Sequence, residues 1–282
     1  MPGSSWPKIS IVTPSYNQAQ FLEETILSVL NQGYPNLEYI IIDGGSTDGS
    51  VDIIRGYEGR LADWVSERDQ GQTHAIQKGF DRSTGEILGW LNSDDTYQPG
   101  ALLAVGEAFA RHPEAGVVYG NANLIDASGK FMRELRSVKY HPLALPVAMN
   151  IHQASTFWRR SLFDRVGKLN MEYQFGGMDY ELFFRFVKAN AGFFFVRKAL
   201  ANYRQHEASK CVAETARVRE LSHRALRKEF PILSLPVVFD VYRLAFRCRQ
   251  LFWWLMQGDG DYVLAGLKRR LLPWTRSRQR GS

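Results

Sequence analysis

The adjacent carboxylates Asp94 and Asp95 are the residues of this sequence that most directly suggest chemistry. Two neighbouring carboxylates repel each other, which costs stability unless a cation lies between them or water solvates them well. Mg²⁺ and Mn²⁺ prefer oxygen ligands and typically take one or two carboxylates together with substrate phosphates. We therefore expect Asp94 and Asp95 to hold Mg²⁺ or Mn²⁺. In the alternative interpretation, one of the two caps the helix expected after Gly100.

Three polar clusters, one of which contains this pair, follow runs of apolar residues. The clusters lie at 13–17, 43–48 and 92–95, and each comes directly after a predicted strand. In open parallel sheets, ligands bind beyond the carboxyl ends of the strands. Each cluster alone could be an ordinary turn, but three clusters on one edge of one sheet predict a binding site.

The elements that must position these clusters alternate between strand and helix over the first 115 residues. The segment 21–31 has apolar residues at helical spacing, and a glycine at position 33 fits the helix end. Apolar runs predict strands at 9–13, 39–42, 64–65 and 86–91, with further helices starting near 51 and covering 72–80 and 101–110. Such repeats predict an α/β fold, in which helices cover both faces of a parallel sheet.

The pattern changes after about residue 115. Short apolar runs predict strands at 117–119, 131–138, 155–158 and 193–196, and an aromatic-rich segment predicts a helix at 180–189. This part is therefore expected to be mixed α+β and to join the same sheet. From about residue 212 onward the chain is expected to be mainly helical.

Five segments resemble glycosyltransferase family 2 in their order and spacing. They read T-P-S-Y-N-Q at 13–18, I-I-I-D-G-G-S-T-D-G-S at 40–50, W-L-N-S-D-D at 90–95, G-G-M-D-Y-E-L at 176–182 and Y-R-Q-H-E-A-S at 203–209. The resemblance implies an inverting enzyme with the GT-A nucleotide-sugar-binding fold. We accordingly expect a catalytic domain over 1–210, with a donor half at about 8–115 and an acceptor half at about 116–210. A basic, aromatic helical tail over 211–282 is expected to follow it.

The resemblance implies donor-binding roles for the first two clusters. Thr13 and Pro14 would supply backbone around the base and ribose, and Tyr16 would pack near the nucleobase. Asp43 would hydrogen-bond the base. These roles place the nucleoside at the ends of the first two strands.

The resemblance also implies how the third cluster and a later segment would hold the diphosphate. Asn92 and Asp94 fill the D-x-D positions of the family, and the asparagine departs from its commonest pattern. An amide is a poorer metal ligand than a carboxylate, so the metal is expected on Asp94 and Asp95. Arg204 would contact phosphate, and His206 would be a further metal ligand.

Asp179 matches the acidic residue that acts as the catalytic base of the family. Transfer with inversion needs a carboxylate that takes the proton of the acceptor hydroxyl as the new bond forms. Glu181 is the rival candidate, and Asp179 could instead cap the helix that follows it. Three weaker donor-site candidates are Asp69, Gln72 and Lys78.

Charge is unevenly distributed along the chain. The whole chain carries +6, but residues 1–203 hold 19 Lys+Arg and 22 Asp+Glu (net −3), whereas residues 204–282 hold 16 and 7 (net +9). Residues 235–257 predict an amphipathic helix with arginines on its polar face and tryptophans near its end. Such a helix suits the interface of an anionic membrane, or it packs its apolar face on the catalytic domain, and both alternatives stay open. No nucleic-acid-binding module is recognised, so no nucleic acid partner is expected.

Length and composition favour an ordinary folded enzyme. With 282 residues, 45% of them hydrophobic, the chain can bury a full core. It shows no secretory signal and no apolar stretch long enough to span a membrane, and its two cysteines are too few for a disulfide framework. We expect a cytoplasmic location, peripheral on the inner membrane if the tail contacts lipid.

Together these features predict a metal-dependent glycosyltransferase. The expected donor is a nucleotide-sugar, with a UDP-sugar favoured, and the expected acceptor is a glycan or a lipid-linked molecule of bacterial surface polysaccharide biosynthesis. One alternative is a sugar nucleotidyltransferase, although residues 13–17 lack the Gly, Lys or Arg of a phosphate-binding loop. Another is a non-catalytic subunit that only binds the donor.

Overall fold

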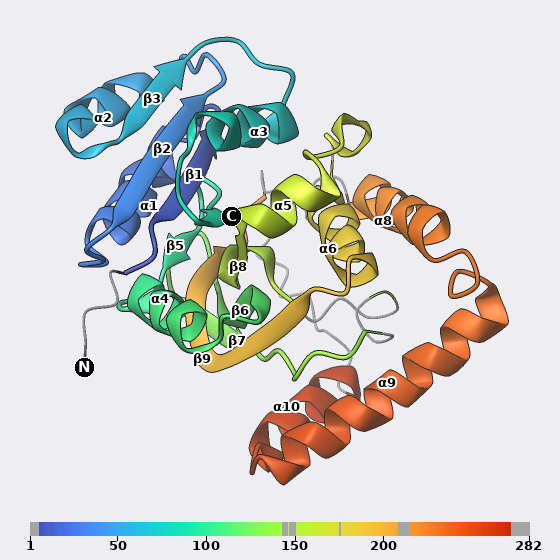
Figure 1. The fold of residues 1–282 in the computed structure, drawn as a ribbon. Coiled ribbons are helices and arrows are strands. Elements are labelled where there is room, and N and C mark those ends of the chain that lie inside the picture. Colours follow the sequence, from blue (N-terminus) through green and yellow to red (C-terminus); the bar gives the residue numbers. More distant parts are fainter. Residues whose placement is uncertain (1–5, 143–145, 147–150, 175, 208–214, 272–282) are drawn as a thin grey trace, which may run out of the picture.

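One mixed sheet organises the molecule. The computed structural model describes residues 6–142, 146, 151–174, 176–207 and 215–271. In these residues nine strands follow the order β3-β2-β1-β4-β8-β6-β9-β5, with β7 paired to β6. Helices lie on both faces of the sheet (Figure 1). The α/β architecture expected from the sequence, with helices on both faces of the sheet, is confirmed.

The first half is a parallel α/β unit. Its strands are β1 (Ile9–Ser15), β2 (Leu37–Asp43), β3 (Asp63–Ser66) and β4 (Ile87–Trp90), and its helices are α1 (Ala19–Leu30), α2 (Ser50–Gly56), η1 (Glu58–Arg60) and α3 (Gln72–Arg82). β1 pairs in parallel with both β2 and β4, and β2 with β3. Successive strand residues point to opposite faces, so β1 sends Val12 into the core beneath α3 and Ile11 into the core beneath α1.

A glycine allows α3 to lie close to the sheet. A Cβ atom on Gly79 would come within 2.4 Å of Val12 Cγ1 on β1. Any larger residue would therefore push α3 away from the strand that it covers. This contact matters for the site because the first turn of α3 lies near the end of β4.

The second half extends the same sheet with antiparallel strands and one further parallel pair. Its elements are β5 (Thr96–Tyr97), α4 (Ala101–Arg111), β6 (Ala115–Ile125), β7 (Phe131–Leu135), η2 (Gln153–Ser155), β8 (Thr156–Arg159), α5 (Arg160–Val166), η3 (Met171–Tyr173), α6 (Met178–Lys188) and β9 (Gly192–Arg204). β8 pairs antiparallel with β4 and β6, and β9 runs parallel to β6. The long strands β6 and β9 thereby carry the chain back toward the ends of the first strands.

The last described part is helical, as expected. It contains α8 (Thr215–Glu229), α9 (Pro236–Met256) and α10 (Gly260–Leu271). Ala225 and Leu226 of α8 are buried in the same core as α6. Figure 1 shows α9 as a long helix at the side of the sheet, with α10 folded back beside it. Among the described residues, no helix combines the length and apolar character needed to cross a membrane.

Most strand and helix boundaries lie within a few residues of those predicted, but several differences stand out. β6 covers 11 residues, whereas only 117–119 was predicted, and the short helix α5 was not predicted. β9 is 13 residues long, whereas the apolar run indicated only 193–196, because Arg197, Lys198 and Asn202 interrupt the apolar pattern of its later part. β7 ends at Leu135 rather than at 138. The two-residue strand β5 was not predicted, since a segment that short has no periodicity to detect.

Candidate active site

The ends of β1, β2 and β4 form one edge of the parallel sheet, which we call the carboxyl edge. It includes the three polar clusters, because each cluster continues from one of these strands. Asp43 closes β2 and is fully buried. Its Oδ2 atom accepts hydrogen bonds from the backbone N–H groups of Gly45 (3.0 Å) and Ser46 (2.9 Å) and from Ser66 Oγ (2.7 Å). Asp43 therefore holds the 43–48 loop in shape at this edge.

Tyr16 lies beside this loop and is accessible to a ligand. Its side chain is 62% exposed. A Cβ atom on Gly44 would come 2.8 Å from Asp69 Oδ2 and 3.3 Å from Tyr16 Cδ2, so these three residues lie in contact. The arrangement leaves an open aromatic ring next to two loops that carry polar groups. It suits the stacking of a nucleobase, the role expected for Tyr16.

Thr13 and Pro14 lie within β1, where only their backbone can serve a ligand. The hydroxyl of Thr13 is buried and accepts a hydrogen bond from Tyr39 (3.0 Å). Pro14 pairs in register with Ile42 of β2. The donor-binding role expected for both residues stays a prediction.

Asp95 is buried in a network of protein hydrogen bonds. Oδ1 accepts from the backbone N–H of Arg204 (2.9 Å), Oδ2 accepts from the side chain of Asn92 (3.2 Å), and the backbone carbonyl accepts from Thr25 Oγ1 (2.8 Å). Burial, and then the charge of neighbouring Asp94, raise the pKa of Asp95 well above its usual range. The two carboxyl oxygens of Asp95 thus already accept hydrogen bonds that hold β9 and Asn92 at the carboxyl edge.

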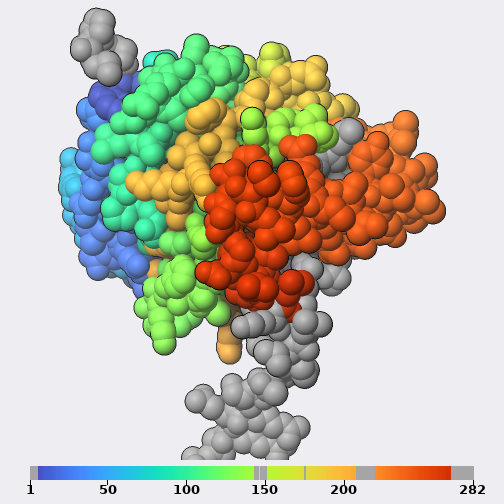
Figure 2. Space-filling model, turned by 90° about the horizontal axis from the view of Figure 1, so that it is seen from below, coloured from blue at the N-terminus to red at the C-terminus, as the bar shows by residue number. Residues whose placement is uncertain are grey.

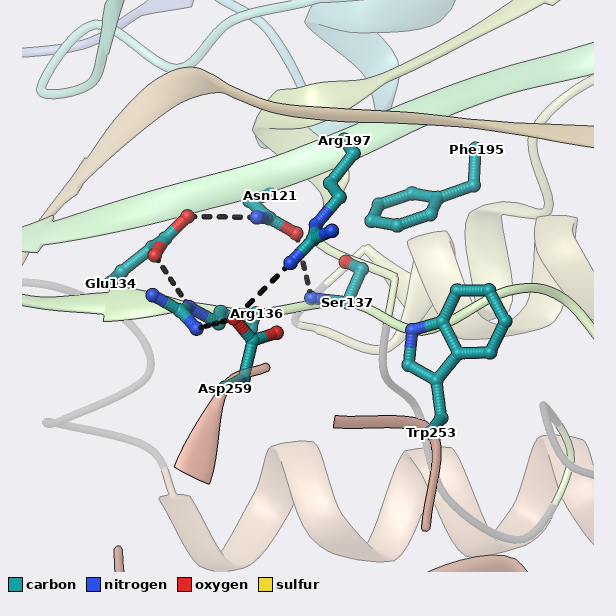
Figure 3. Close-up of a pocket in the computed structure, with 8 residues that line it drawn as sticks. All are labelled: Asn121, Glu134, Arg136, Ser137, Phe195, Arg197, Trp253 and Asp259. Atoms are coloured by element: carbon teal, nitrogen blue, oxygen red, sulfur yellow. Dashed lines mark hydrogen bonds and ion pairs between the residues drawn. The ribbon is translucent and has the colours of Figure 1, made fainter. Parts of the chain in front are cut away.

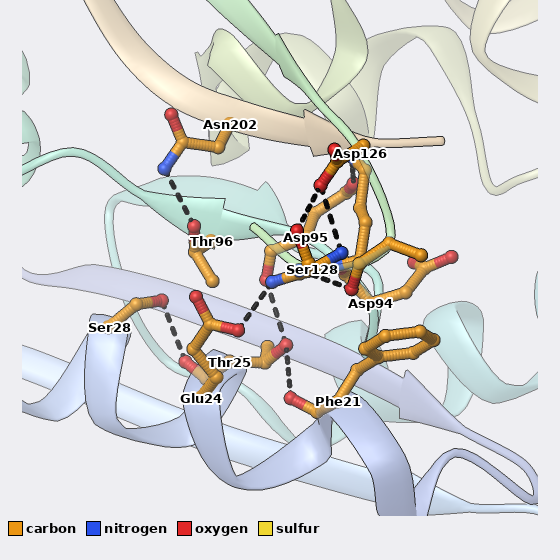
Figure 4. Close-up of polar contacts among 12 residues, drawn as sticks. Phe21, Glu24, Thr25, Ser28, Asp94, Asp95, Thr96, Asp126, Ser128 and Asn202 are labelled. Atoms are coloured by element: carbon orange, nitrogen blue, oxygen red, sulfur yellow. Dashed lines mark hydrogen bonds and ion pairs between the residues drawn. The ribbon is translucent and has the colours of Figure 1, made fainter. Parts of the chain in front are cut away.

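Asp94 points to a different partner. Its Oδ2 atom lies 2.9 Å from Nε2 of His206, and its side chain is less deeply buried than that of Asp95. The ring of His206 packs against Phe21 of α1, with ring centroids 4.8 Å apart. Figure 4 shows Asp94 and Asp95 between α1, represented by Glu24 and Thr25, and the turn that contains Asp126 and Ser128. Neither aspartate caps the next helix, because Gly100 is the N-cap residue of α4 and no side chain caps it.

Arg204 connects several elements of this region through its buried side chain. It is 1% exposed, and its guanidinium pairs with Glu24, donates to the backbone oxygens of Asp94 (2.9 Å) and Ala127 (3.2 Å), and lies over the ring of Phe21. A buried cation that loses its partner typically costs about 3–5 kcal/mol. With its donors engaged in this way, Arg204 joins α1, β9 and the 126–129 turn around Asp94. The expected direct contact with phosphate is therefore less suited to its side chain than this positioning role.

Asp94 and His206 have the donor chemistry that a hard divalent ion uses. Among the described residues, no group of three or more His, Cys, Asp or Glu side chains is arranged to hold a metal. Mg²⁺ and Mn²⁺, however, commonly take only one or two protein ligands and complete their shell with phosphate oxygens and water. One carboxylate beside one imidazole fits that requirement, whereas both carboxyl oxygens of buried Asp95 already accept hydrogen bonds from the protein. The expected trio Asp94, Asp95 and His206 thus divides into two candidate ligands that face each other, with side chains 18% (Asp94) and 8% (His206) exposed, and one fully buried support.

A polar link joins this corner to the first turn of α3. The amide of Gln72 donates to Asn92 Oδ1 (2.7 Å), and Asn92 in turn donates to Asp95. The next residue of α3, Thr73, donates to Met178 Sδ at the start of α6 (2.9 Å). The carboxyl edge is therefore connected to the helix that contains Asp179. Lys78, one turn further along α3, pairs with Glu67 instead (2.6 Å).

Asp179 lies in the first turn of α6, after an N-cap at Gly177 that carries no side-chain cap. Burial raises the pKa of its carboxyl group, against the opposing effect of backbone N–H groups in the first turn. A raised pKa makes a carboxylate a better proton acceptor. Glu181 is occupied elsewhere, because it is 2% exposed and forms a two-pronged ion pair with Arg185. Of the two candidate bases, Asp179 is the one with no ion pair among those found in the described residues.

Two residues of α1 belong to this site although no sequence pattern pointed to them. Glu24 pairs with Arg204 across 180 positions of sequence, and Phe21 packs against both Arg204 and His206. In the sequence they are an ordinary helical glutamate and an ordinary core phenylalanine. The only available signal was their position on α1, directly after the first polar cluster.

Comparison with known proteins identifies the fold and its relatives. The family model described as Glycosyl transferase family 2 matches residues 10–199. The putative teichuronic acid biosynthesis glycosyltransferase TuaG of Bacillus subtilis is 38% identical over 103 residues, covering 35% of this chain and 41% of that protein. A PGL/p-HBAD biosynthesis glycosyltransferase of Mycobacterium bovis is 28% identical over 172 residues, covering 60% and 65%. The matches thus span about half the length of these curated relatives.

Solved structures show the same architecture. TarS 1–349 of S. aureus in complex with UDP-GlcNAc has a TM-score of 0.62 at 18% identity, covering 85% of this chain and 71% of that one. The mannosyltransferase PcManGT from Pyrobaculum calidifontis, in complex with GDP-Man and Mn²⁺, has a TM-score of 0.63 at 17% identity, covering 95% and 82%. At these identities the likeness concerns the fold alone.

Proposed function

Because this chain belongs to glycosyl transferase family 2, we propose that it moves a sugar from a nucleotide-activated donor to a hydroxyl group of a glycan or lipid-linked acceptor. The observation that carries the proposal is the convergence at one sheet edge of Tyr16, Asp43 and the Asp94–His206 pair. Asn92 and Gln72 link this edge to α3, and Thr73 of α3 contacts Met178 at the start of the helix that contains Asp179. The names of the relatives support a product in cell-surface glycan synthesis.

In this proposal the donor lies along the carboxyl edge. The exposed ring of Tyr16 stacks on the nucleobase, and the 43–48 loop that Asp43 holds surrounds the nucleoside. The diphosphate reaches Asp94 and His206, which would hold Mg²⁺ or Mn²⁺. That ion, when bound, offsets the negative charge that develops on the departing diphosphate. A UDP-sugar is our first choice of donor, and a GDP-sugar is the second, since relatives of this fold were crystallised with each.

Transfer then requires one displacement at the anomeric carbon. The acceptor oxygen forms a bond to that carbon while the bond from the carbon to the diphosphate oxygen breaks, and the electron pair leaves with the diphosphate. The carboxylate of Asp179 takes the hydroxyl proton, a task favoured by its raised pKa. Asp95 and Arg204 fix the positions of β9 and α1 around the site and do not touch the reacting atoms.

A donor panel tests the proposal. Purified protein is incubated with UDP- and GDP-sugars and Mn²⁺, and release of nucleoside diphosphate is measured with and without lipid-linked acceptors. We expect turnover with at least one donor, and a loss of about 100-fold or more in Asp179→Asn, because a general base contributes about 10²–10⁴-fold. The matched control is Asp164→Asn, at an exposed aspartate of α5. Absence of turnover with every donor, or equal rates in both variants, would refute the proposal.

A further inference from the structure

The helix α9 has two apolar faces, and within the part of the chain that the structure describes only one of them is buried. On the covered face, Phe246 is 5% exposed and lies in a small core with Val138 and Leu233. Partly buried Phe239, Trp253 and Trp254 pack against the same core. This face accounts for the attachment of α9 to the catalytic domain, one of the two alternatives that the sequence left open.

The opposite face forms a continuous exposed stripe. We call it the α9 stripe; its residues are Val237, Val241, Leu244, Cys248, Leu251 and Leu255. Their spacing of 4, 3, 4, 3 and 4 places all six on one side of a helix with 3.6 residues per turn. Val237 and Leu244 are 76% and 65% exposed. Contiguous apolar surface of this kind normally marks an interaction site.

The neighbouring helix also has exposed apolar side chains. Leu264 and Leu267 of α10 are exposed and one turn apart. α10 packs beside α9, and Figure 2 shows the two helices gathered on one face of the molecule. Exposed apolar side chains are therefore present on both helices of the tail.

Charges beside the stripe are mostly positive. Arg243, Arg247 and Arg249 of α9 are all exposed, whereas Asp240 is the one acidic residue of this helix and pairs with Arg243 (2.9 Å). From Lys268 to the end, the sequence contains six further Lys and Arg and no Asp or Glu. This composition complements an anionic surface.

We propose that the α9 stripe docks on the surface of an anionic phospholipid membrane, with α9 lying in the plane of the interface. Helices that lie there combine an apolar face with flanking basic residues, and each basic residue near anionic lipid adds to the attraction. The 3–4 spacing would also suit pairing with a second copy. Such pairing would bring the arginines of two α9 helices close together, where they repel each other. The acidic residue of α9, Asp240, would not offset this repulsion, because it already pairs with Arg243. The charge distribution therefore favours lipid over a second copy.

A cluster of ion pairs fixes α9 and α10 to the sheet. Asp259, between the two helices, pairs with Arg136 just after β7 and with Arg197 of β9 (3.2 Å), and Arg136 also lies over the ring of Tyr262 (4.7 Å). Figure 3 shows that this cluster lines a pocket, and that Trp253 also lines it. β9 ends at Arg204, beside Asp94. Docking of the stripe would thus hold the carboxyl edge at a set position relative to the membrane.

Vesicle co-sedimentation tests the inference and requires neither donor nor acceptor, so its outcome is separate from that of the proposed function. The vesicles are phosphatidylcholine alone and phosphatidylcholine with about one third phosphatidylglycerol. We expect binding mainly to the anionic vesicles. Leu244→Gln/Leu251→Gln should weaken it at least about tenfold, because two leucines lose their transfer into lipid. Arg247→Gln should weaken binding to the anionic vesicles only.

Met132→Gln is the matched control, since Met132 is an exposed apolar residue of β7 outside the stripe. Circular dichroism checks that the variants fold, as expected for changes at exposed positions. Equal sedimentation of the parent and the double variant would overturn the inference. The inference would also be overturned if the parent protein did not sediment with vesicles but formed dimers that the double variant does not form. In a Cys211→Ser background, oxidative cross-linking through Cys248 would identify such dimers, because Cys248 lies within the stripe.

Discussion

At the residue scale, the adjacent carboxylates Asp94 and Asp95 have different partners. Asp95 is turned inward and uses both carboxyl oxygens to hold Asn92 and the backbone of Arg204, whereas Asp94 faces His206. Adjacent carboxylates therefore need not share one ion. Their repulsion is relieved because burial and the neighbouring charge favour the protonated form of Asp95. In the proposed function, this division would let a chain with asparagine at position 92 still bind a metal through Asp94 and His206.

The raised pKa of Asp179 predicts the pH dependence of turnover. A general base must be deprotonated, so kcat/KM should rise with pH through the pKa of Asp179 in the free enzyme. Because burial raises that pKa, the acidic limb should lie above the usual range of an aspartate. A pH profile of kcat/KM with a saturating metal concentration measures it. An identical limb in the residual activity of Asp179→Asn would show that another group is responsible.

At the element scale, the structure depends on how α1, α3 and β9 meet the carboxyl edge. α3 approaches β1 closely because position 79 is glycine, and its first turn then supplies Gln72 to Asn92. β9 supplies Arg204, whose guanidinium reaches Glu24 of α1. The helices thus serve as supports for side chains that come from strand ends.

Close packing at Gly79 predicts a clear cost for a single methyl group. Gly79→Ala should lower the free energy of unfolding by about 1–3 kcal/mol, because the new Cβ meets Val12 and forces α3 outward. Urea denaturation measures the change. The control is Gly56→Ala at the end of α2, where a Cβ would meet nothing within 4 Å. Equal effects of the two substitutions would contradict the packing described here.

The ion pairs of Asp259 predict a local rather than a global effect. Asp259→Asn should leave the catalytic core intact but speed hydrogen exchange in α9 and α10, because Arg136 and Arg197 lose their shared carboxylate. Exchange measured by mass spectrometry, segment by segment, tests this. Asp261→Asn, at an exposed position of the first turn of α10, is the control. Unchanged exchange in both variants would mean that the apolar core alone holds these helices.

The strand ends could be predicted from the sequence, whereas the supports around them could not. Apolar runs followed by polar clusters predict where the strands end, and therefore where Asp43 and Asp94 lie. This prediction is possible because the apolar pattern of a buried strand involves only residues close together in the sequence. The pairing of Glu24 with Arg204 joins residues 180 positions apart and follows only from the packing of α1 beside β9. The later half of β9 was missed for a related reason. Its polar residues become strand because β6 lies alongside.

At the scale of the whole molecule, charge and apolar surface are segregated. The first 203 residues carry a net charge of −3 and include most of the carboxyl edge, whereas the remainder carries +9. The tail packs on the domain through α8 and through one face of α9, so it is not a detached appendage in the described residues. The proposed site and the α9 stripe are joined by β9, which extends from Gly192 to Arg204.

The central claim is that Asp94, supported by Asp95, forms a metal-dependent diphosphate site at the carboxyl edge. Titration calorimetry of UDP and GDP, with Mn²⁺ and with a chelator, tests it most directly on the parent and on Asp94→Asn. The account predicts saturable binding of one nucleotide that requires Mn²⁺ and becomes at least about tenfold weaker in the variant, a change of about 1.4 kcal/mol or more. Binding that is equally tight in Asp94→Asn, or that persists with the chelator, would contradict it.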